Sequence, residues 1–286
     1  MDDVTNKRAW VTKQSNNKYD FAVLGSSRAF GSFDMKELNA LTNKSGVNIG
    51  ADGSGYVDNY ITLYLFLKNR NRIDSLFLQV DIYSLNSKMN FSNAFHVFHF
   101  LPYWKDSLVR DCLLPFLTRK DEFMWDNIPA VRYFTYNKYF SPKEILRRFL
   151  NRKNVSPFDE NFGGPSGYSE DDNWMQTGCC TTTSQARAFD NLDVEFLEKI
   201  IGLCEARQIK LIAYKAPELA SYRQSILNYD SLDATVDTLL RGHGLRYIKS
   251  AEIIEGDLRN FKNPTHLSGR GRQVFTRSFA GGLGNP

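Results

Sequence analysis

The hydrophobic positions of this chain follow one rhythm in its first and last thirds. Short continuous apolar runs alternate there with segments whose apolar residues recur at helical spacing. The runs predict strands over 21–25, 47–49, 75–81, 209–214 and 245–248. The helical segments are 34–44, 56–69, 192–207, 228–241 and 269–280. Strands that alternate with helices predict an α/β fold, with right-handed crossovers and a parallel sheet of about five strands.

Residues 86–190 interrupt this alternation. The stretch is rich in aromatic residues, and it predicts helices around 91–118, 128–137 and 142–150 before a loop-like segment over 154–186. Long insertions at the carboxyl edge of a sheet commonly form lids or binding walls. We therefore expect a single domain over 1–286, in which the insertion 86–190 walls the functional site.

The composition is that of an ordinary globular protein. Of the 286 residues, 42% are hydrophobic and 24% are charged, and the formal net charge is +4. No apolar run reaches the ~18 residues that a membrane span needs. The basic residues are scattered, apart from a cluster of Arg147, Arg148, Arg152 and Lys153. A nucleic-acid footprint needs a denser stripe, so we predict a solvated helix end and no nucleic-acid partner. An anionic polymer or lipid headgroup is the alternative for this cluster.

The cysteines and the paired histidines predict no cofactor site. The four cysteines, Cys112, Cys179, Cys180 and Cys204, contain no CxxC pair, so a cysteine zinc site is not expected. We interpret them as free thiols, with a disulfide from Cys112 to one of the adjacent pair as the alternative. The spacing of His96 and His99 can hold a metal, but no acidic residue lies near them in sequence. We predict an aromatic helix face there, and neither a metal nor an organic cofactor.

Three residues stand where a parallel sheet would gather them. Ser27 follows the first predicted strand, Gly53 follows the second, and His266 precedes the last helix. In an open α/β sheet, ligands bind at the carboxyl edge that these positions share. A serine beside a histidine can act as a nucleophile. The backbone N–H groups of Ser27 and Gly53 could then stabilise the oxyanion.

Three motifs in this order resemble those of the SGNH/GDSL hydrolase superfamily. They are Gly25-Ser26-Ser27, the segment Asn48 to Gly53, and Asn263-Pro264-Thr265-His266-Leu267. The resemblance covers 20–83 and 192–280, and it is nearest to the bacterial envelope branch that reads GSS in place of GDS. It implies a three-layer, flavodoxin-like sandwich without a cofactor. It also implies that Ser27 is the nucleophile, that Gly53 is an oxyanion donor, and that His266 is the base.

The chain departs from that pattern at two positions. The family usually places an aspartate three residues before the histidine, where this chain has Asn263. A neutral amide can orient an imidazole but cannot stabilise imidazolium as a carboxylate does. The family's third oxyanion donor, an asparagine after the third strand, has only Gln79 as a counterpart. Ionised Asp81 cannot donate a hydrogen bond. Catalysis is therefore expected to be weak, to use a Ser–His dyad, or to be lost.

The remaining candidates have structural interpretations beside the functional ones. Arg28, Trp104 and Trp174 are expected to bind substrate, although buried packing is the ordinary role of a tryptophan. Ser27 could instead be a helix N-cap, and His266 a hydrogen-bonded structural residue. Asn48 is interpreted as a turn or strand-end residue. Asp52 is interpreted as a turn residue, with orientation of His266 as the alternative.

The function that we expect from these features is that of an O-acyl esterase or acyltransferase. It would transfer acetyl groups on a carbohydrate or envelope glycan through an acyl-serine. The alternative is a degenerate domain that binds glycan or a membrane O-acyltransferase partner without turnover. A third interpretation is a lipid esterase. The expected location is the bacterial envelope or periplasm, with an anchoring segment outside the given chain, and the alternative is the cytoplasm.

Overall fold

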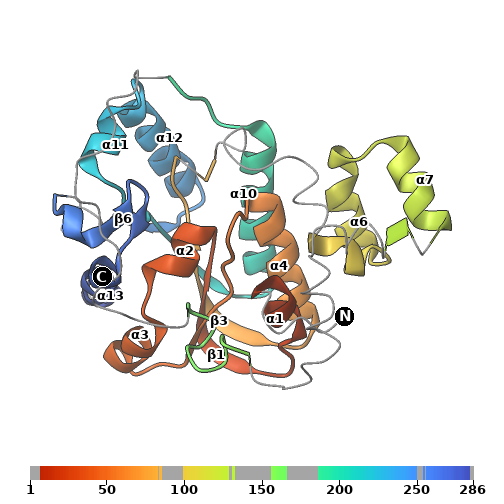
Figure 1. Ribbon diagram of the computed structural model, residues 1–286, viewed down its shortest axis with the longest axis horizontal. Coiled ribbons are helices and arrows are strands. Elements are labelled where there is room, and N and C mark those ends of the chain that lie inside the picture. Colours follow the sequence, from red (N-terminus) through yellow and green to blue (C-terminus); the bar gives the residue numbers. More distant parts are fainter. Residues whose placement is uncertain are drawn as a thin grey trace.

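The protein is built around a five-stranded, all-parallel sheet. The computed structural model describes residues 7–82, 84–85, 99–128, 131–132, 156–165, 186–249, 254 and 256–283. The strands are β1 (Lys18–Leu24), β2 (Gly46–Asn48), β3 (Arg72–Gln79), β4 (Lys210–Tyr214) and β5 (Arg246–Ile248). Their spatial order is β2-β1-β3-β4-β5, and Figure 1 labels the neighbouring strands β1 and β3. This is the flavodoxin-like order, in which the direction of the winding reverses between β1 and β3.

Alternate residues of each central strand enter two separate cores. On one face, Ala22 and Leu24 of β1 pack under the helices α4 (Tyr56–Lys68) and α10 (Asn191–Ala206). On the other face, Phe21 and Val23 pack with α3 (Met35–Thr42) and α13 (Gly269–Leu283). Side chains that alternate across a strand while both faces are apolar require helices on both sides of the sheet. The three-layer α/β sandwich that the sequence predicts is therefore the fold of the chain.

The remaining helices cover the ends and edges of the sheet. They are α1 (Lys7–Lys13), α2 (Ser27–Ser32), α6 (Ser107–Leu113), α7 (Arg119–Asn127), α11 (Ala220–Gln224) and α12 (Tyr229–Gly242). Short 3-10 turns are η2 (Leu101–Tyr103), η3 (Leu114–Phe116) and η5 (Leu258–Asn260). A two-stranded antiparallel hairpin, β6 (Phe261–Asn263) with β7 (His266–Leu267), precedes α13.

All five predicted strands and all five predicted main helices are present, with shifted ends. The largest shift is in β3, which begins at Arg72 and ends at Gln79, so Asp81 lies beyond the strand. The helix α7 lies between the helices predicted around 91–118 and 128–137. The helices α1, α2 and α11 and the β6–β7 hairpin are absent from the sequence prediction. Each is too short to show a hydrophobic period.

The described parts of the insertion 86–190 lie in two different places. Asp106, the N-cap of α6, accepts hydrogen bonds from Tyr64 and Lys68 at the carboxyl end of α4. Because α4 runs from the carboxyl edge of the sheet back to the amino edge, this part lies away from Ser27, and Figure 1 shows α6 and α7 beyond α4. Residues 156–165 instead adjoin β2, where Asn48 N–H donates to the carbonyl of Phe162 at 2.8 Å.

Several sequence predictions fall outside the described residues. These are His96, the pair Cys179 and Cys180, Trp174, and the basic cluster at 147–153. Cys112 and Cys204 are buried free thiols. Burial raises the pKa of the Cys112 thiol to about 11. No helix within the described ranges is both long and apolar enough to span a membrane.

Candidate active site

The site begins at a tight turn that ends β1. Gly25 has φ +154°, and a Cβ placed there would lie 2.6 Å from Cβ of Gln79 and 2.7 Å from Cβ of Ala29. Only glycine fits so close to both neighbours. Ser26, not Ser27, is the N-cap of α2, because its side chain accepts from the backbone N–H of Arg28. Ser27 is thereby the first residue of α2 and remains partly exposed.

The β6–β7 hairpin brings the histidine to this turn from the other end of the chain. The hydroxyl oxygen of Ser27 lies 2.8 Å from Nε2 of His266. This distance is within the 2.6–3.2 Å range, roughly, of a working nucleophile and base. The structure thus brings together the two residues that the sequence motifs single out, 239 positions apart.

The contacts of Asn263 define the tautomer of the histidine. Its Oδ1 lies 3.1 Å from the backbone N–H of Thr265 and 3.0 Å from Nδ1 of His266. A backbone N–H can only donate, so the shared Asn263 atom is the carbonyl oxygen, an acceptor. Nδ1 therefore carries the proton and donates to Asn263, while Nε2 keeps a lone pair that accepts from Ser27 Oγ–H. Asn263 orients the base as the aspartate of a Ser-His-Asp triad would, but without its charge.

The imidazole is held in its neutral form. Burial, together with the positive charges of Arg28 and Lys262, lowers the pKa of His266 to about 4. In a carboxylate-containing triad, the acidic partner would oppose these effects. His266 is consequently deprotonated and able to accept a proton at neutral pH, but it is a weak base.

The loop after β2 lies against the Ser27 turn and contains Gly53. Ala51 N–H donates to the carbonyl of Gly25 at 3.2 Å, and Gly53 has φ +66°. The amides of Gly50, Ala51 and Ser54 are engaged within this region. Among the hydrogen bonds of the described residues, the amides of Ser27 and Gly53 have no acceptor. These two donors match the predicted oxyanion hole, and that role remains a prediction.

The helix α1, which the sequence prediction lacks, braces this loop. Arg8 Nη2 donates to the carbonyl of Asp52 at 2.7 Å and to the hydroxyl of Ser54 at 2.9 Å. Lys7 Nζ donates to the carbonyl of Asn48 at 2.5 Å and to that of Gly163 at 2.6 Å. Burial lowers the pKa of Lys7 well below its ordinary value. The buried side chains of Lys7 and Arg8 therefore hold the backbone on both sides of the predicted oxyanion donor.

Gln79 does not serve as an oxyanion donor, so this prediction is wrong. The side chain is 1% exposed, and its Nε2 donates to Asp81 at 2.9 Å. Its Oε1 accepts from Ser26 N–H, Ser26 Oγ and Ala29 N–H at 3.0, 3.0 and 3.1 Å. Gln79 thus fixes the backbone of the nucleophile turn. Asn48, interpreted from sequence as a turn residue, is buried and likewise bonds the carbonyl of Ala29 and the amide of Gly50.

Replacing Gln79 with alanine is expected to destabilise the fold. The amides of Ser26 and Ala29 would each lose their acceptor in a dry environment, at about 1–3 kcal/mol per group. We expect a loss of about 2–4 kcal/mol in the free energy of unfolding, measured by urea denaturation at unchanged m. Gln224→Ala, at an exposed position of α11, is the control and should change stability by less than about 0.5 kcal/mol. Equal losses in the two variants would contradict this role.

Two of the predicted substrate contacts are also wrong. The side chain of Arg28 is 0% exposed and forms ion pairs with Asp81 and Glu218 at 3.0 and 3.3 Å. Trp104 is 2% exposed and packs edge-on against Trp125 at 5.3 Å between ring centroids. Neither side chain reaches solvent, so neither can meet a substrate. Trp174 lies outside the described residues.

Taken together, this geometry is that of a serine nucleophile paired with a histidine base at the carboxyl edge of a parallel sheet. No family model matches the chain, and no curated protein matches it. Among solved structures, the chain is similar to a protein of Desulfitobacterium hafniense DCB-2 described as lipolytic and of the G-D-S-L family. The similarity covers 91% of this chain and 98% of that one, with 10% identity and a TM-score of 0.43. We therefore base the functional proposal on the geometry of the site.

Proposed function

We propose that the protein is a serine esterase or acyltransferase that works through an acyl-serine intermediate. The observation that carries this proposal is the 2.8 Å contact between Ser27 Oγ and His266 Nε2, with Nδ1 anchored on Asn263. A serine whose proton faces an oriented, neutral imidazole is an activated nucleophile. The free amides of Ser27 and Gly53 offer donors for the developing oxyanion.

The reaction follows from the tautomer. Ser27 Oγ attacks the ester carbonyl while its proton passes to Nε2 of His266, and the carbonyl electrons move onto the oxyanion. Collapse of this intermediate expels the alcohol, which takes the proton from Nε2, and leaves the acyl group on Ser27. Water or an acceptor hydroxyl then attacks the acyl-serine and gives its proton to Nε2. The acid or the acylated acceptor leaves, and Ser27 regains its proton.

In its narrower form, the proposal is that the acyl group is acetyl and that the acceptor is a carbohydrate or an envelope glycan. This narrower form rests on the resemblance of the three motifs to the GSS-type envelope branch. A location in the envelope and a membrane O-acyltransferase partner belong to the same proposal. They can be tested by comparing acetylated oligosaccharides with p-nitrophenyl esters of two to twelve carbons. A preference for long acyl chains would favour a lipid esterase instead.

A second candidate function is that of a binding domain without turnover. It is favoured by the neutral Asn263, which stands in the place of a carboxylate. It is also favoured by the bond from Gln79 to Asp81, because only the amides of Ser27 and Gly53 are then proposed as oxyanion donors. The two candidates differ in the reactivity of Ser27.

A fluorophosphonate probe with peptide mapping separates these functions. The esterase proposal predicts that Ser27 is labelled, and that labelling is lost in His266→Ala because the proton acceptor is gone. His243→Ala is the control, since His243 caps the exposed end of α12. Absence of labelling in the folded wild type would overturn the proposal and leave the binding domain.

A further inference from the structure

The site is assembled from two segments that lie far apart in the chain, although α2, which begins at Ser27, contacts β7, which carries His266. The Ser27 turn belongs to the central sheet, whereas His266 lies on the separate β6–β7 hairpin. Reaction rates in such sites depend steeply on the distance between the two groups, and a misplacement of about 1 Å can cost about 10²-fold. Contacts that fix the hairpin relative to the turn therefore matter for the rate. Besides the packing of α2 on β7, a buried cluster of charges is bonded to the segments that support both sides.

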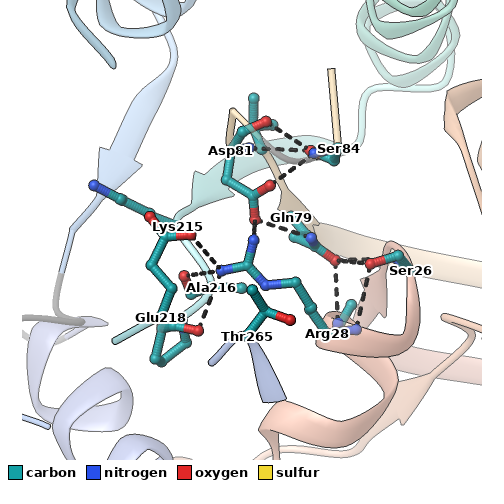
Figure 2. A network of polar contacts seen from close by, with 12 residues as sticks. Ser26, Arg28, Gln79, Asp81, Ser84, Lys215, Ala216, Glu218 and Thr265 are labelled. Atoms are coloured by element: carbon teal, nitrogen blue, oxygen red, sulfur yellow. Dashed lines mark hydrogen bonds and ion pairs between the residues drawn. The ribbon is translucent and has the colours of Figure 1, made fainter. Parts of the chain in front are cut away.

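Arg28, the residue after the nucleophile, is the centre of this cluster. Figure 2 shows its guanidinium between Asp81 on one side and the 216–218 segment on the other. Nη1 lies 3.0 Å from Asp81, and Nη2 lies 3.3 Å from Glu218. Nη2 also donates to the carbonyls of Ala216 and Pro217 at 2.7 and 3.1 Å. The planar fork of arginine suits this set of acceptors, whereas the single ammonium of lysine does not.

The 216–219 segment continues the link to the histidine. Leu219 N–H donates to the carbonyl of Pro264 at 2.9 Å, two residues before His266. The hydroxyl of Thr265, the residue after Pro264, lies 3.1 Å from Nδ1 of His266. Glu218 is held from the far side by the hydroxyl of Tyr229. Arg28 is thus connected to the hairpin through the backbone that follows β4.

The other side of the cluster returns to the nucleophile. Asp81 accepts from Gln79 Nε2, and Gln79 Oε1 accepts from the amides of Ser26 and Ala29, which flank Ser27 and Arg28. Arg28 is therefore joined to the Ser27 turn twice. Its backbone belongs to the turn, and its guanidinium pairs with Asp81, which bonds Gln79 and through it the amides of Ser26 and Ala29. One rigid, buried network includes the backbone before and after the nucleophile and the support of the base.

We propose that Arg28 is the positioning residue that holds the His266 hairpin at reacting distance from Ser27. This inference rests on the proposed esterase function. Apolar residues of similar volume often replace a buried ion pair without loss of stability. We therefore assign this ion-pair cluster a role in positioning the reacting groups rather than in stabilising the fold. Its bonds are directed at the two segments that supply those groups.

Arg28→Lys tests the proposal, because it keeps the charge and removes the fork. We expect kcat for p-nitrophenyl acetate to fall about tenfold, part of the 10²-fold that misplacement can cost, while KM stays within about twofold. Arg110→Lys is the matched control, in an ion-pair cluster on α6 and α7 far from the site. A folded Arg28→Lys protein with wild-type kcat would overturn the proposal. So would a fall shared by Arg110→Lys.

Glu218→Gln covers the case in which Arg28→Lys fails to fold. The amide oxygen can still accept from Arg28, but the charge-assisted bond, about twice as strong as a neutral one, is lost. We expect a threefold to tenfold lower kcat, roughly, at unchanged KM. Glu195→Gln, in a surface pair with Lys199, should keep the wild-type rate. Wild-type kcat in folded Glu218→Gln, with Arg28→Lys unfolded, would overturn the proposal.

Failure of the proposed esterase function can be distinguished from failure of the positioning role of Arg28. If wild type and Ser27→Ala hydrolyse the ester equally slowly, the proposed function fails. The ¹⁵N NMR signals of His266, assigned through His266→Gln, then decide the positioning role without turnover. They should shift in Arg28→Lys while those of His243 stay in place, and unchanged His266 signals would overturn it.

Discussion

Replacing Asn263 with aspartate is expected to raise kcat for p-nitrophenyl acetate by about 10²-fold or more at pH 7. The reverse change in a serine protease triad lowers kcat by about 10⁴-fold. In this protein the Oδ1 of Asn263 already lies 3.0 Å from Nδ1 of His266. A carboxylate in the same place would keep the tautomer and would also stabilise the imidazolium that forms during the reaction.

The same substitution should move the pH dependence of kcat/KM. Activity requires neutral His266, so it is lost as the pH falls through the histidine pKa. In the wild type that pKa is about 4, and we expect an acid limb near this value. The groups that act on the imidazole are the cations Arg28 and Lys262 and the uncharged Ser27, Asn263 and Thr265. Aspartate at 263 favours the charged imidazole and raises its pKa, so the acid limb should move to higher pH.

The pH–rate profile from pH 3.5 to 9 supplies the measurement. Thr265→Asn is not a suitable control because Thr265 also contacts Nδ1. Asn161→Asp adds the same charge in the 156–165 segment, away from His266, and should leave the acid limb in place. An unchanged rate and profile in Asn263→Asp would mean that another group already provides the charge, or that the chemistry is not that of a triad.

Replacing Ser27 with alanine is expected to lower the Asn263→Asp rate by more than the wild-type rate. In a full triad, loss of the serine costs about 2 × 10⁶-fold and loss of the aspartate about 3 × 10⁴-fold. The wild type resembles a triad that has already lost the acid. The remaining decrease on Ser27→Ala should therefore be about 10²-fold, measured as kcat for p-nitrophenyl acetate at equal concentrations of folded protein.

Two controls make this result specific. Ser45→Ala, between α3 and β2 at the opposite edge of the sheet, should keep the wild-type rate. Ser27→Ala in the Asn263→Asp background should lose the gain as well, because the two residues act as a unit. Equal rates in wild type and Ser27→Ala would show that the observed turnover does not use this serine.

The sequence predicts the sheet and the pairing of Ser27 with His266 because both depend on local patterns. Buried strands appear as continuous apolar runs, and the first two motifs lie directly beside such runs, while the third directly precedes the last predicted helix. The sequence also predicts the partner that orients the base, since Asn263 is only three residues from His266. It does not predict the side chains that hold the site in place. Arg8, Gln79 and Arg28 act through contacts with residues 44, 53 and 188 positions away, and no spacing rule predicts contacts at such separations.

The errors have the same origin. Arg28 follows the nucleophile and Trp104 lies in an aromatic stretch, and both are residue types that are common in binding sites. Their burial depends on packing against distant segments, so composition alone could not separate contact with substrate from contact with the core. Gln79 occupies the right place for a third donor, but its amide is already engaged by Asp81.

Because Lys7 and Arg8 of α1 bond the 48–54 loop, we expect that α1 cannot be removed without loss of activity. A shortened chain that begins at β1 would retain every strand, Ser27 and His266. It would lack Lys7 and Arg8, whose side chains bond the carbonyls of Asn48 and Asp52. Such a truncation is expected to fold around the same sheet yet bind the reacting carbonyl poorly. The proposed function therefore predicts that the first helix is required for activity, although it contains none of the reacting groups.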